Sequence, residues 1–278
     1  MNTTVTIGVS LKTYFGNARA REWLTTTAAC AAMHPAVVGG AVRCFVVPTY
    51  LQVDDALTAF AGTRVLVGAQ DVSQFEPGAY TGEVTAAELA EIGVAVAEIG
   101  HAERRRLLGD TDEVVAAKAR TTLAHGITPV LCIGETDRAM DTAATAIAQL
   151  RVALEGAPAG SVIVAYEPVW AIGAAEPAPA DRIVAVASAL RAELDRMPGR
   201  DGSAVIYGGC AGPGMLADIG DAVDGLFLGR FAHDPDNLLA VLDEASILAK
   251  RRADARSGRA LRAGHRVSAE WSRGLMGA

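Results

Sequence analysis

Eight short apolar runs, separated by longer segments of a different pattern, constrain the fold of this chain more than any other feature. The runs lie at 5–9, 42–47, 64–69, 95–99, 128–133, 162–166, 204–208 and 225–229. Most are almost continuously apolar, which is typical of strands buried on both faces of a parallel sheet. Amphipathic, alanine-rich segments lie between most of them, at 17–34, 112–125, 138–155 and 179–197, with a last one at about 236–250. The alternation predicts an α/β fold.

Eight strands that alternate with helices favour a single closed (β/α)8 barrel, which we place at residues 1–250. The 278 residues would also suit two ordinary domains, but barrels of this kind run to about 250 residues as one domain. The alternative is an open, doubly wound sheet. Such a sheet usually carries a GxGxxG motif after its first strand, and the segment IGVSLKTYFG (7–16) lacks that motif.

The composition changes after residue 250. Residues 251–278 are rich in arginine, and we expect a basic C-terminal extension that is solvated and partly helical or disordered. The alternative is a docking segment for another subunit or an anionic partner, anchored by Trp271 and Leu275.

Charge and cysteine content restrict the class of protein. The formal net charge of −7 argues against nucleic acid or an anionic membrane as the main partner, but not against a small anionic substrate in a locally positive pocket. Four scattered cysteines without CxxC spacing suit a reduced protein with no metal site. The N-terminal MNTTVTIGVSLK does not resemble a signal peptide, and no apolar stretch reaches about 18 residues. We therefore expect a cytoplasmic protein.

The active site of a (β/α)8 barrel lies at the C-terminal ends of its strands, so the residues after each run are the candidates. Ser10 and Lys12 follow the first run, and a lysine there can meet an anion or be an ordinary surface lysine. His101 follows the fourth run, with Glu103 and Arg104 at a predicted helix start. This histidine is either a proton donor in the site or a hydrogen-bonded structural residue.

Later loops add a base, a lid and a phosphate site to the prediction. Glu167 ends an apolar run, where partial desolvation raises the pKa of a carboxyl group and makes it a better base. Residues 168–178 mix large apolar residues with Gly, Ala and Pro, which suits a lid as well as an ordinary loop. The glycine-rich segments 207–214 and 227–234 expose backbone N–H groups that bind phosphate.

Several motifs resemble those of the triosephosphate isomerase family. They are AYEPVWAIG (165–173), GAQDVSQFEPGAYTGEVTAAEL (68–89), IGHAERR (99–105), VLCIGET (130–136), YGG (207–209) and DGLFLG (224–229). They occur in the family's order over roughly residues 5–250. The resemblance implies a TIM barrel that isomerises a small phosphorylated sugar without a cofactor or a metal.

The resemblance also implies roles for individual residues. Glu167 corresponds to the catalytic base, His101 to the electrophile and Lys12 to the contact with the substrate anion. The phosphate cradle corresponds to backbone groups of Gly173, Cys210, Gly229 and Arg230. Glu103 corresponds to the glutamate beside the histidine, and Cys132 to a buried cysteine near the base.

The resemblance further implies a lid and a subunit interface. The lid contains Pro168, Val169, Trp170, Ala171, Ile172, Ala174 and Ala175. The segment GAYTGE (78–83) matches the loop through which two subunits of the family interlock, with Thr81 reaching the neighbour's site. A homodimer or a higher homo-oligomer is therefore expected.

The chain departs from the family's housekeeping enzymes around the pocket. Ser10 replaces an asparagine, Ala102 a serine, Cys210 a serine and Arg230 a glycine, and the lid ends in AAEPA (174–178) instead of a Gly-Lys stretch. Ser10 and Ala102 are smaller than the residues they replace and would leave room near the reacting end of the substrate.

The smaller residues suggest a longer substrate. L-Erythrulose 1-phosphate is dihydroxyacetone phosphate with one extra CH2OH on the reacting carbon, and GLFLGR (225–230) resembles the family's tetrulose-phosphate isomerase branch. The predicted reaction is its conversion to D-erythrulose 4-phosphate. The alternatives are neutral drift in an ordinary triosephosphate isomerase and a non-catalytic, phosphate-binding barrel.

Overall fold

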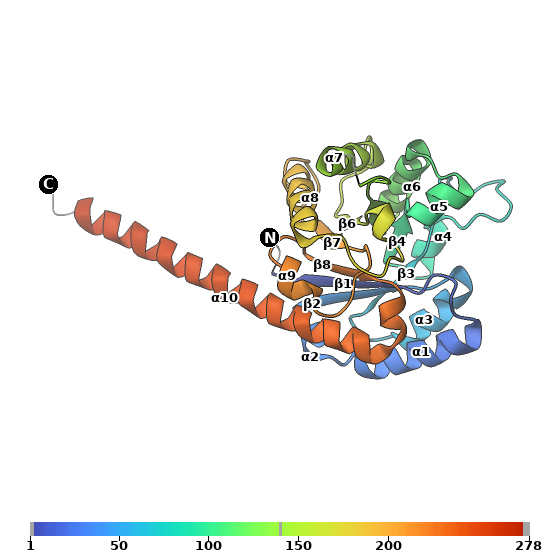
Figure 1. The fold of residues 1–278 in the computed structure, drawn as a ribbon, viewed down its shortest axis with the longest axis horizontal. Helices are drawn as coiled ribbons and strands as arrows, with labels where there is room; N and C mark the ends of the chain where they lie inside the picture. Colours follow the sequence, from blue (N-terminus) through green and yellow to red (C-terminus); the bar gives the residue numbers. More distant parts are fainter. Residues whose placement is uncertain (1–2, 139–140, 275–278) are drawn as a thin grey trace.

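A computed structural model of the chain, which describes residues 3–138 and 141–274, shows a closed barrel of eight parallel strands (Figure 1). The strands pair in sequence order, and β8 closes the barrel against β1. Their bounds are β1 Val5–Ser10, β2 Val42–Val47, β3 Leu66–Ala69, β4 Val96–Ile99, β5 Thr128–Ile133, β6 Ile163–Tyr166, β7 Ala204–Tyr207 and β8 Gly225–Leu228. The predicted (β/α)8 barrel is confirmed, and each strand lies within its predicted run or extends it by one residue.

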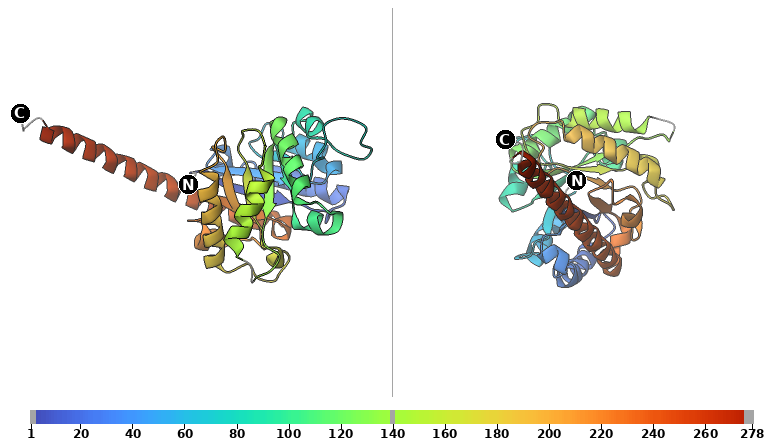
Figure 2. Two further views of the ribbon diagram at one scale, coloured as in Figure 1. Left: turned by 90° about the horizontal axis from the view of Figure 1, so that it is seen from above. Right: turned by 90° about the vertical axis from the view of Figure 1, so that its left-hand side faces the viewer.

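Helices cover the outside of the barrel (Figures 1 and 2). They are α1 Asn17–Cys30, α2 Pro35–Val38, α3 Val53–Ala59, α4 Ala86–Glu91, α5 Ala102–Leu108, α6 Asp112–Ala124, α7 Thr142–Ala153, α8 Ala180–Leu194, α9 Met215–Ile219 and α10 Pro235–Gly274, with 3-10 turns η1 Tyr50–Gln52, η2 Val169–Ala171 and η3 Arg230–His233. The five predicted helical segments correspond to α1, α6, α7, α8 and α10. Apart from α5, whose start at Glu103 and Arg104 was predicted, the short helices were not predicted, because a few residues do not display a helical period.

The continuous apolar runs follow from burial on both faces of the strands. One layer of side chains packs between the strands and the helices, and a second fills the inside of the barrel. The inner layer includes Phe45 and Phe227, whose rings lie 5.6 Å apart between centroids. Gly8 makes room for them, because a Cβ at this position would lie 2.1 Å from the Phe45 ring.

Helix α10 is longer than predicted. Its first part packs against the barrel through buried residues such as Leu238, Leu242 and Leu248. The helix then continues to Gly274 and stands away from the barrel (Figure 2). Arg252 ties the start of the predicted extension to the barrel, because its Nη2 donates to the carbonyl of Gly220 at 2.6 Å. Leu275 lies outside the described residues, and a separate extension at 251–278 stays a prediction.

No disulfide is present, since Cys30, Cys44, Cys132 and Cys210 are all free. Within residues 3–138 and 141–274, no helix combines the length and the apolar character that a membrane span requires.

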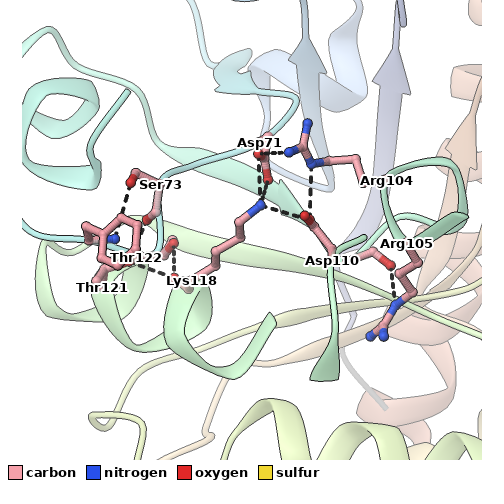
Figure 3. Close-up of polar contacts among 10 residues, drawn as sticks. Asp71, Ser73, Arg104, Arg105, Asp110, Lys118, Thr121 and Thr122 are labelled. Carbon is pink, nitrogen blue, oxygen red and sulfur yellow. Dashed lines mark hydrogen bonds and ion pairs between the residues drawn. The ribbon is translucent and has the colours of Figure 1, made fainter. Parts of the chain in front are cut away.

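A buried network of charges joins β3, α5 and α6 beside the barrel mouth (Figure 3). Lys118 of α6 donates to both oxygens of Asp71 at 2.7 and 2.9 Å and to Asp110 at 2.8 Å. Arg104 of α5 contacts the same two carboxylates at 2.8 and 3.1 Å. Two cations thus balance two anions, and the network fixes the position of α5, the helix that His101 precedes.

Replacement of Lys118 by Met should destabilise the barrel strongly. The ammonium is almost fully buried, and its loss leaves Asp71 and Asp110 with only Arg104 for compensation. We expect the free energy of unfolding in urea to fall by about 3–5 kcal/mol. Arg120→Met, at an exposed position of the same helix, is the control and should change it by less than about 0.5 kcal/mol. Equal losses in both variants would contradict a structural role for the network.

Candidate active site

A cavity of about 730 Å³ opens at the C-terminal ends of the strands and gathers the predicted site. Its lining contains Ser10, Lys12, His101, Ala102, Glu103, Glu167, Gly173, Cys210, Gly229 and Arg230, and the lid residues Val169, Ile172, Ala174 and Ala175. Residues separated by up to 220 positions in sequence, from Ser10 to Arg230, are thus brought together by barrel closure, as the strand-end argument predicts.

His101 lies at the N-cap of α5 with its ring oriented by the backbone. Its Nδ1 accepts a hydrogen bond from the Glu103 N–H at 3.1 Å. Burial, together with the positive charge of Lys12, lowers the pKa of His101 to about 4. The ring is therefore neutral near pH 7, and because Nδ1 is an acceptor, the proton is on Nε2.

Lys12 points its ammonium group at the same place. Nζ lies 2.9 Å from Glu103 Oε1 and 3.3 Å from His101 Nε2. Two donors at 3.3 Å cannot bond to each other, so together they favour an oxygen with negative charge beside them. The backbone of Lys12 is strained, with φ of 46°, and the side-chain amide of Gln70 holds it by donating to the Lys12 carbonyl at 3.0 Å.

Glu167 follows β6 directly and is 5% exposed. Burial, reinforced by the nearby Glu98, raises the pKa of Glu167 to about 8. Its Oε2 lies 3.4 Å from His101 Nε2 and has no hydrogen-bond partner within the described chain. Cys132 hydrogen-bonds to the carboxylate and opposes the rise. Gly208 provides the space, since a Cβ there would lie 2.4 Å from Glu167 Oε1.

Glu98 is a site residue that the sequence analysis missed. It lies on β4, lines the cavity and is 3% exposed. Its Oε2 accepts a hydrogen bond from Ser10 Oγ at 2.9 Å. Burial raises its pKa to about 7, although Lys12 and Ser10 oppose the rise. The sequence signal was one charged residue in an otherwise apolar run, VAEI (96–99).

The N-terminal end of the predicted lid, residues 168–178, contacts Glu135, another residue that the sequence analysis did not single out. Trp170 Nε1 donates to Glu135 Oε1 at 2.9 Å, and Tyr166 Oη lies 3.2 Å from Oε2. The Val169 N–H donates to the Glu135 carbonyl at 2.9 Å. Pro168, Trp170 and Ala171 of the predicted lid lie at this fixed end and do not line the cavity.

The C-terminal end of the predicted lid is held by hydrogen bonds with β7 and the loop that follows it. The Ala178 N–H donates to Tyr207 Oη at 3.0 Å, and Cys210 Sγ donates to the Ala174 carbonyl at 3.3 Å. Cys210 adopts the left-handed conformation, with φ of 56°, which a non-glycine residue rarely does. Gly173 also has a positive φ, of 72°. The segment from Val169, which bonds to Glu135, to Ala178, which bonds to Tyr207, is therefore fixed at both ends.

Positive side chains surround the part of the cavity near η3. Arg230 reaches the lid, because a Cβ on Gly173 would lie 4.0 Å from its Nη2. Arg19, which the sequence analysis missed, lines the same region, and its guanidinium lies 4.2 Å above the Phe15 ring. Burial and these two arginines lower the pKa of His233 nearby. This end of the cavity suits an anion, whereas Glu98 and Glu167 make the opposite end acidic.

Thr81 does not reach the cavity of its own chain. It is exposed in the loop between β3 and α4, which stands out from the barrel (Figure 2). Phe75 and Tyr80 in that loop stack with centroids 4.2 Å apart, and both are partly exposed. Among the side chains that the structure describes, those of residues 3–138 and 141–258, no three His, Cys, Asp or Glu gather in a way that could hold a metal ion.

The ionisation state of His101 is open to direct measurement. We expect its ring nitrogens to remain in the neutral, Nε2-protonated form throughout the pH range in which an ordinary histidine titrates, because its folded pKa is near 4. Nitrogen chemical shifts in a two-dimensional NMR spectrum report this form. His125, which is more exposed and lies 2.8 Å from Glu76, is the internal comparison. A His101 ring that gains a proton near pH 6.5 would contradict the assignment.

Comparison with known proteins identifies the family. The model of the triosephosphate isomerase family matches residues 5–245. A Pectobacterium atrosepticum protein named L-erythrulose-1-phosphate isomerase is 45% identical over 253 residues, which cover 89% of this chain and 98% of that protein. Triosephosphate isomerases of Mycobacteroides abscessus and Thermus thermophilus are 42% and 39% identical over 202 and 208 residues, covering 68% and 71% of this chain and 77% and 83% of theirs. The chain therefore belongs to the triosephosphate isomerase family, as a sugar-phosphate isomerase of that family.

Proposed function

We propose that the chain interconverts L-erythrulose 1-phosphate and D-erythrulose 4-phosphate. The observation that carries the proposal is the acidic end of the cavity, where the small side chains of Ser10 and Ala102 line the wall beside His101. A four-carbon substrate needs room there for its terminal CH2OH. The similarity to a protein named L-erythrulose-1-phosphate isomerase, over nearly the whole of both chains, supports the same substrate.

Glu167 acts as the base in this proposal. Its ionised carboxylate takes the proton from C3 of L-erythrulose 1-phosphate, and the electrons of that bond form the C2–C3 double bond of an enediolate. The same carboxyl group returns the proton to C2, a proton passes from O3 to O2, and the carbonyl has moved by one carbon. The unpaired Oε2 is free to receive the carbon-bound proton. A base with a pKa near 8 matches a reaction near neutral pH.

His101 and Lys12 stabilise the enediolate. Both present N–H groups at one position, 3.3 Å apart, where the negative oxygen forms. A neutral imidazole is the better partner here, because a charged ring beside the Lys12 ammonium would cost free energy, as the lowered pKa of His101 indicates. Glu103 supports the pair, holding the Lys12 ammonium through its carboxylate and the His101 ring through its N–H.

The phosphate occupies the positive end of the cavity. Backbone groups of Gly173, Cys210, Gly229 and Arg230 form its cradle, and the Arg230 side chain adds a charged contact from η3. The lid covers the substrate and excludes water, which limits loss of phosphate from the enediolate.

We also propose a homodimer, in which the exposed loop that carries Thr81 enters the site of the neighbouring subunit.

Purified protein assayed with L-erythrulose 1-phosphate and with glyceraldehyde 3-phosphate tests the substrate. We expect kcat/KM to be higher for the tetrulose phosphate. A triose value higher by about tenfold or more, equivalent to 1.4 kcal/mol of transition-state binding, would make the chain an ordinary triosephosphate isomerase. Turnover of neither compound, with phosphate still bound, would favour a non-catalytic barrel.

Glu167→Gln should abolish proton exchange while phosphate binding is kept. The amide cannot accept a proton from carbon, so kcat should fall by at least about 10³-fold. The inhibition constant of inorganic phosphate measures binding at the other end of the cavity and should change little. Arg230→Met is the converse variant, in which phosphate binding weakens while solvent-proton exchange into bound substrate persists. Near-normal exchange in Glu167→Gln would refute the assignment of the base.

Ser10→Asn combined with Ala102→Ser should shift preference toward the triose phosphate. The two larger side chains refill the space beside His101 that the terminal CH2OH requires. Poor fit of one extra group is worth about 1–3 kcal/mol, so the ratio of the two kcat/KM values should move by about tenfold or more. An unchanged ratio would locate specificity elsewhere in the cavity.

A further inference from the structure

Glu98 is a buried acid that the mechanism above does not use. It lies on β4 in the segment VAEI (96–99), where the neighbouring side chain on the same face, Val96, is part of the apolar layer inside the barrel. Its hydrogen-bond partner, Ser10, is on β1, which is not a neighbour of β4 in the barrel order. The Ser10–Glu98 bond therefore crosses the interior of the barrel, below the mouth.

A carboxyl group in this apolar layer destabilises the folded state, because it is removed from water. Desolvation of an acid costs several kcal/mol unless hydrogen bonds replace the lost water. Ser10 Oγ supplies one such bond, to Oε2 at 2.9 Å. Among the described residues, the hydrogen bond from Ser10 is made to Oε2 and none is made to Oε1, and Glu98 lines the cavity. One oxygen is thus paired, and the other is available to whatever fills the acidic end.

The position of Glu98 relative to the reacting atoms follows from its neighbours. It is close enough to Glu167 to be the main charge that raises the pKa of that carboxyl, and Lys12 interacts with both acids. The anionic groups of the substrate belong at the other end of the cavity, beside Arg230. A substituent on the reacting carbon that points away from the phosphate therefore extends toward Ser10 and Glu98.

We infer that Glu98 and Ser10 form the binding site for the terminal hydroxyl of the substrate, with the hydroxyl donating to Glu98 Oε1. This inference rests on the proposed function, and it names the residues that make a four-carbon substrate preferable to a three-carbon one. The triose phosphate has hydrogen in place of CH2OH. It lacks the hydroxyl that would donate to Oε1, and loss of a hydrogen bond that a site is built to make rejects the shorter substrate.

A purely indirect role for Glu98 makes a different prediction. If Glu98 only supports packing or tunes Glu167, its loss must affect both substrates equally, because they share the reacting carbons and the phosphate. Only a direct contact with the terminal hydroxyl affects the tetrulose phosphate alone. The triose phosphate is therefore the matched control substrate.

Glu98→Leu is the test, with kcat/KM measured for both substrates at a pH above the pKa of Glu167 in each variant. We expect the value for L-erythrulose 1-phosphate to fall by about 10- to 100-fold, chiefly through KM, while the triose value stays within about threefold of wild type. Glu98→Gln keeps the volume and the hydrogen-bonding capacity, so it should retain most of the preference. Val96→Ala, on the same face of β4 but outside the cavity lining, should leave the ratio unchanged.

Ser10→Ala provides a second test in case Glu98→Leu does not fold. It removes the other half of the pair with little change in volume, and it should lower the tetrulose value selectively. Equal losses for both substrates, or no loss for either, in the folded variants would overturn the inference. The proposed function is judged separately, on the wild-type preference. A wild type that prefers the tetrulose phosphate, with variants that keep this preference, would refute only the role of Glu98.

Discussion

Burial of the Glu167 carboxyl at the end of an apolar strand is the constraint on which the rest of the site depends. Burial raises the pKa of this group to about 8, so folding favours its protonated form. The corresponding stability is complete below the ordinary pKa of a glutamate and is lost as the pH rises through the folded value. An ionised Glu167 therefore opposes folding. The closed barrel can bear this loss of folding free energy, because each strand is paired on both sides and packed by apolar layers on both faces.

The surroundings of Glu167 reflect this constraint. A charged His101 is not needed to compensate the carboxylate, because Lys12 already supplies a positive charge that Glu103 holds in place. The ring can then stay neutral and act as a directional donor. The network of Asp71, Lys118, Asp110 and Arg104 adds no charge to the cavity, since its charges cancel, but it fixes the helix that begins after His101. Charge is thus balanced within the network, and in the cavity Lys12 is paired with Glu103.

Most of the fold could be predicted from the sequence, because burial on both faces leaves a continuous apolar run for each strand. The length of α10 could not, since a basic composition does not stop a helix: the tail after residue 250 was expected to be partly helical or disordered, and the helix continues to Gly274. The candidates after each strand were found because a barrel fixes where its site lies. Glu98 was missed because it lies within a strand, and Glu135 and Tyr207 because their importance depends on partners 35 and 29 positions away in sequence.

The hydrogen bonds at the two ends of the proposed lid bear on the rate of turnover. The N-terminal anchor is Glu135, with bonds from Trp170 and Val169, and the C-terminal anchor is the Tyr207 hydroxyl on the Ala178 N–H. If residues 168–178 act as the proposed lid, the hydrogen bonds that hold them at both ends must exchange partners before the segment can move. The barrier to that exchange is independent of how easily the proton leaves carbon. The residues that set the upper limit of turnover are thus expected to lie at the hinges, outside the reacting centre.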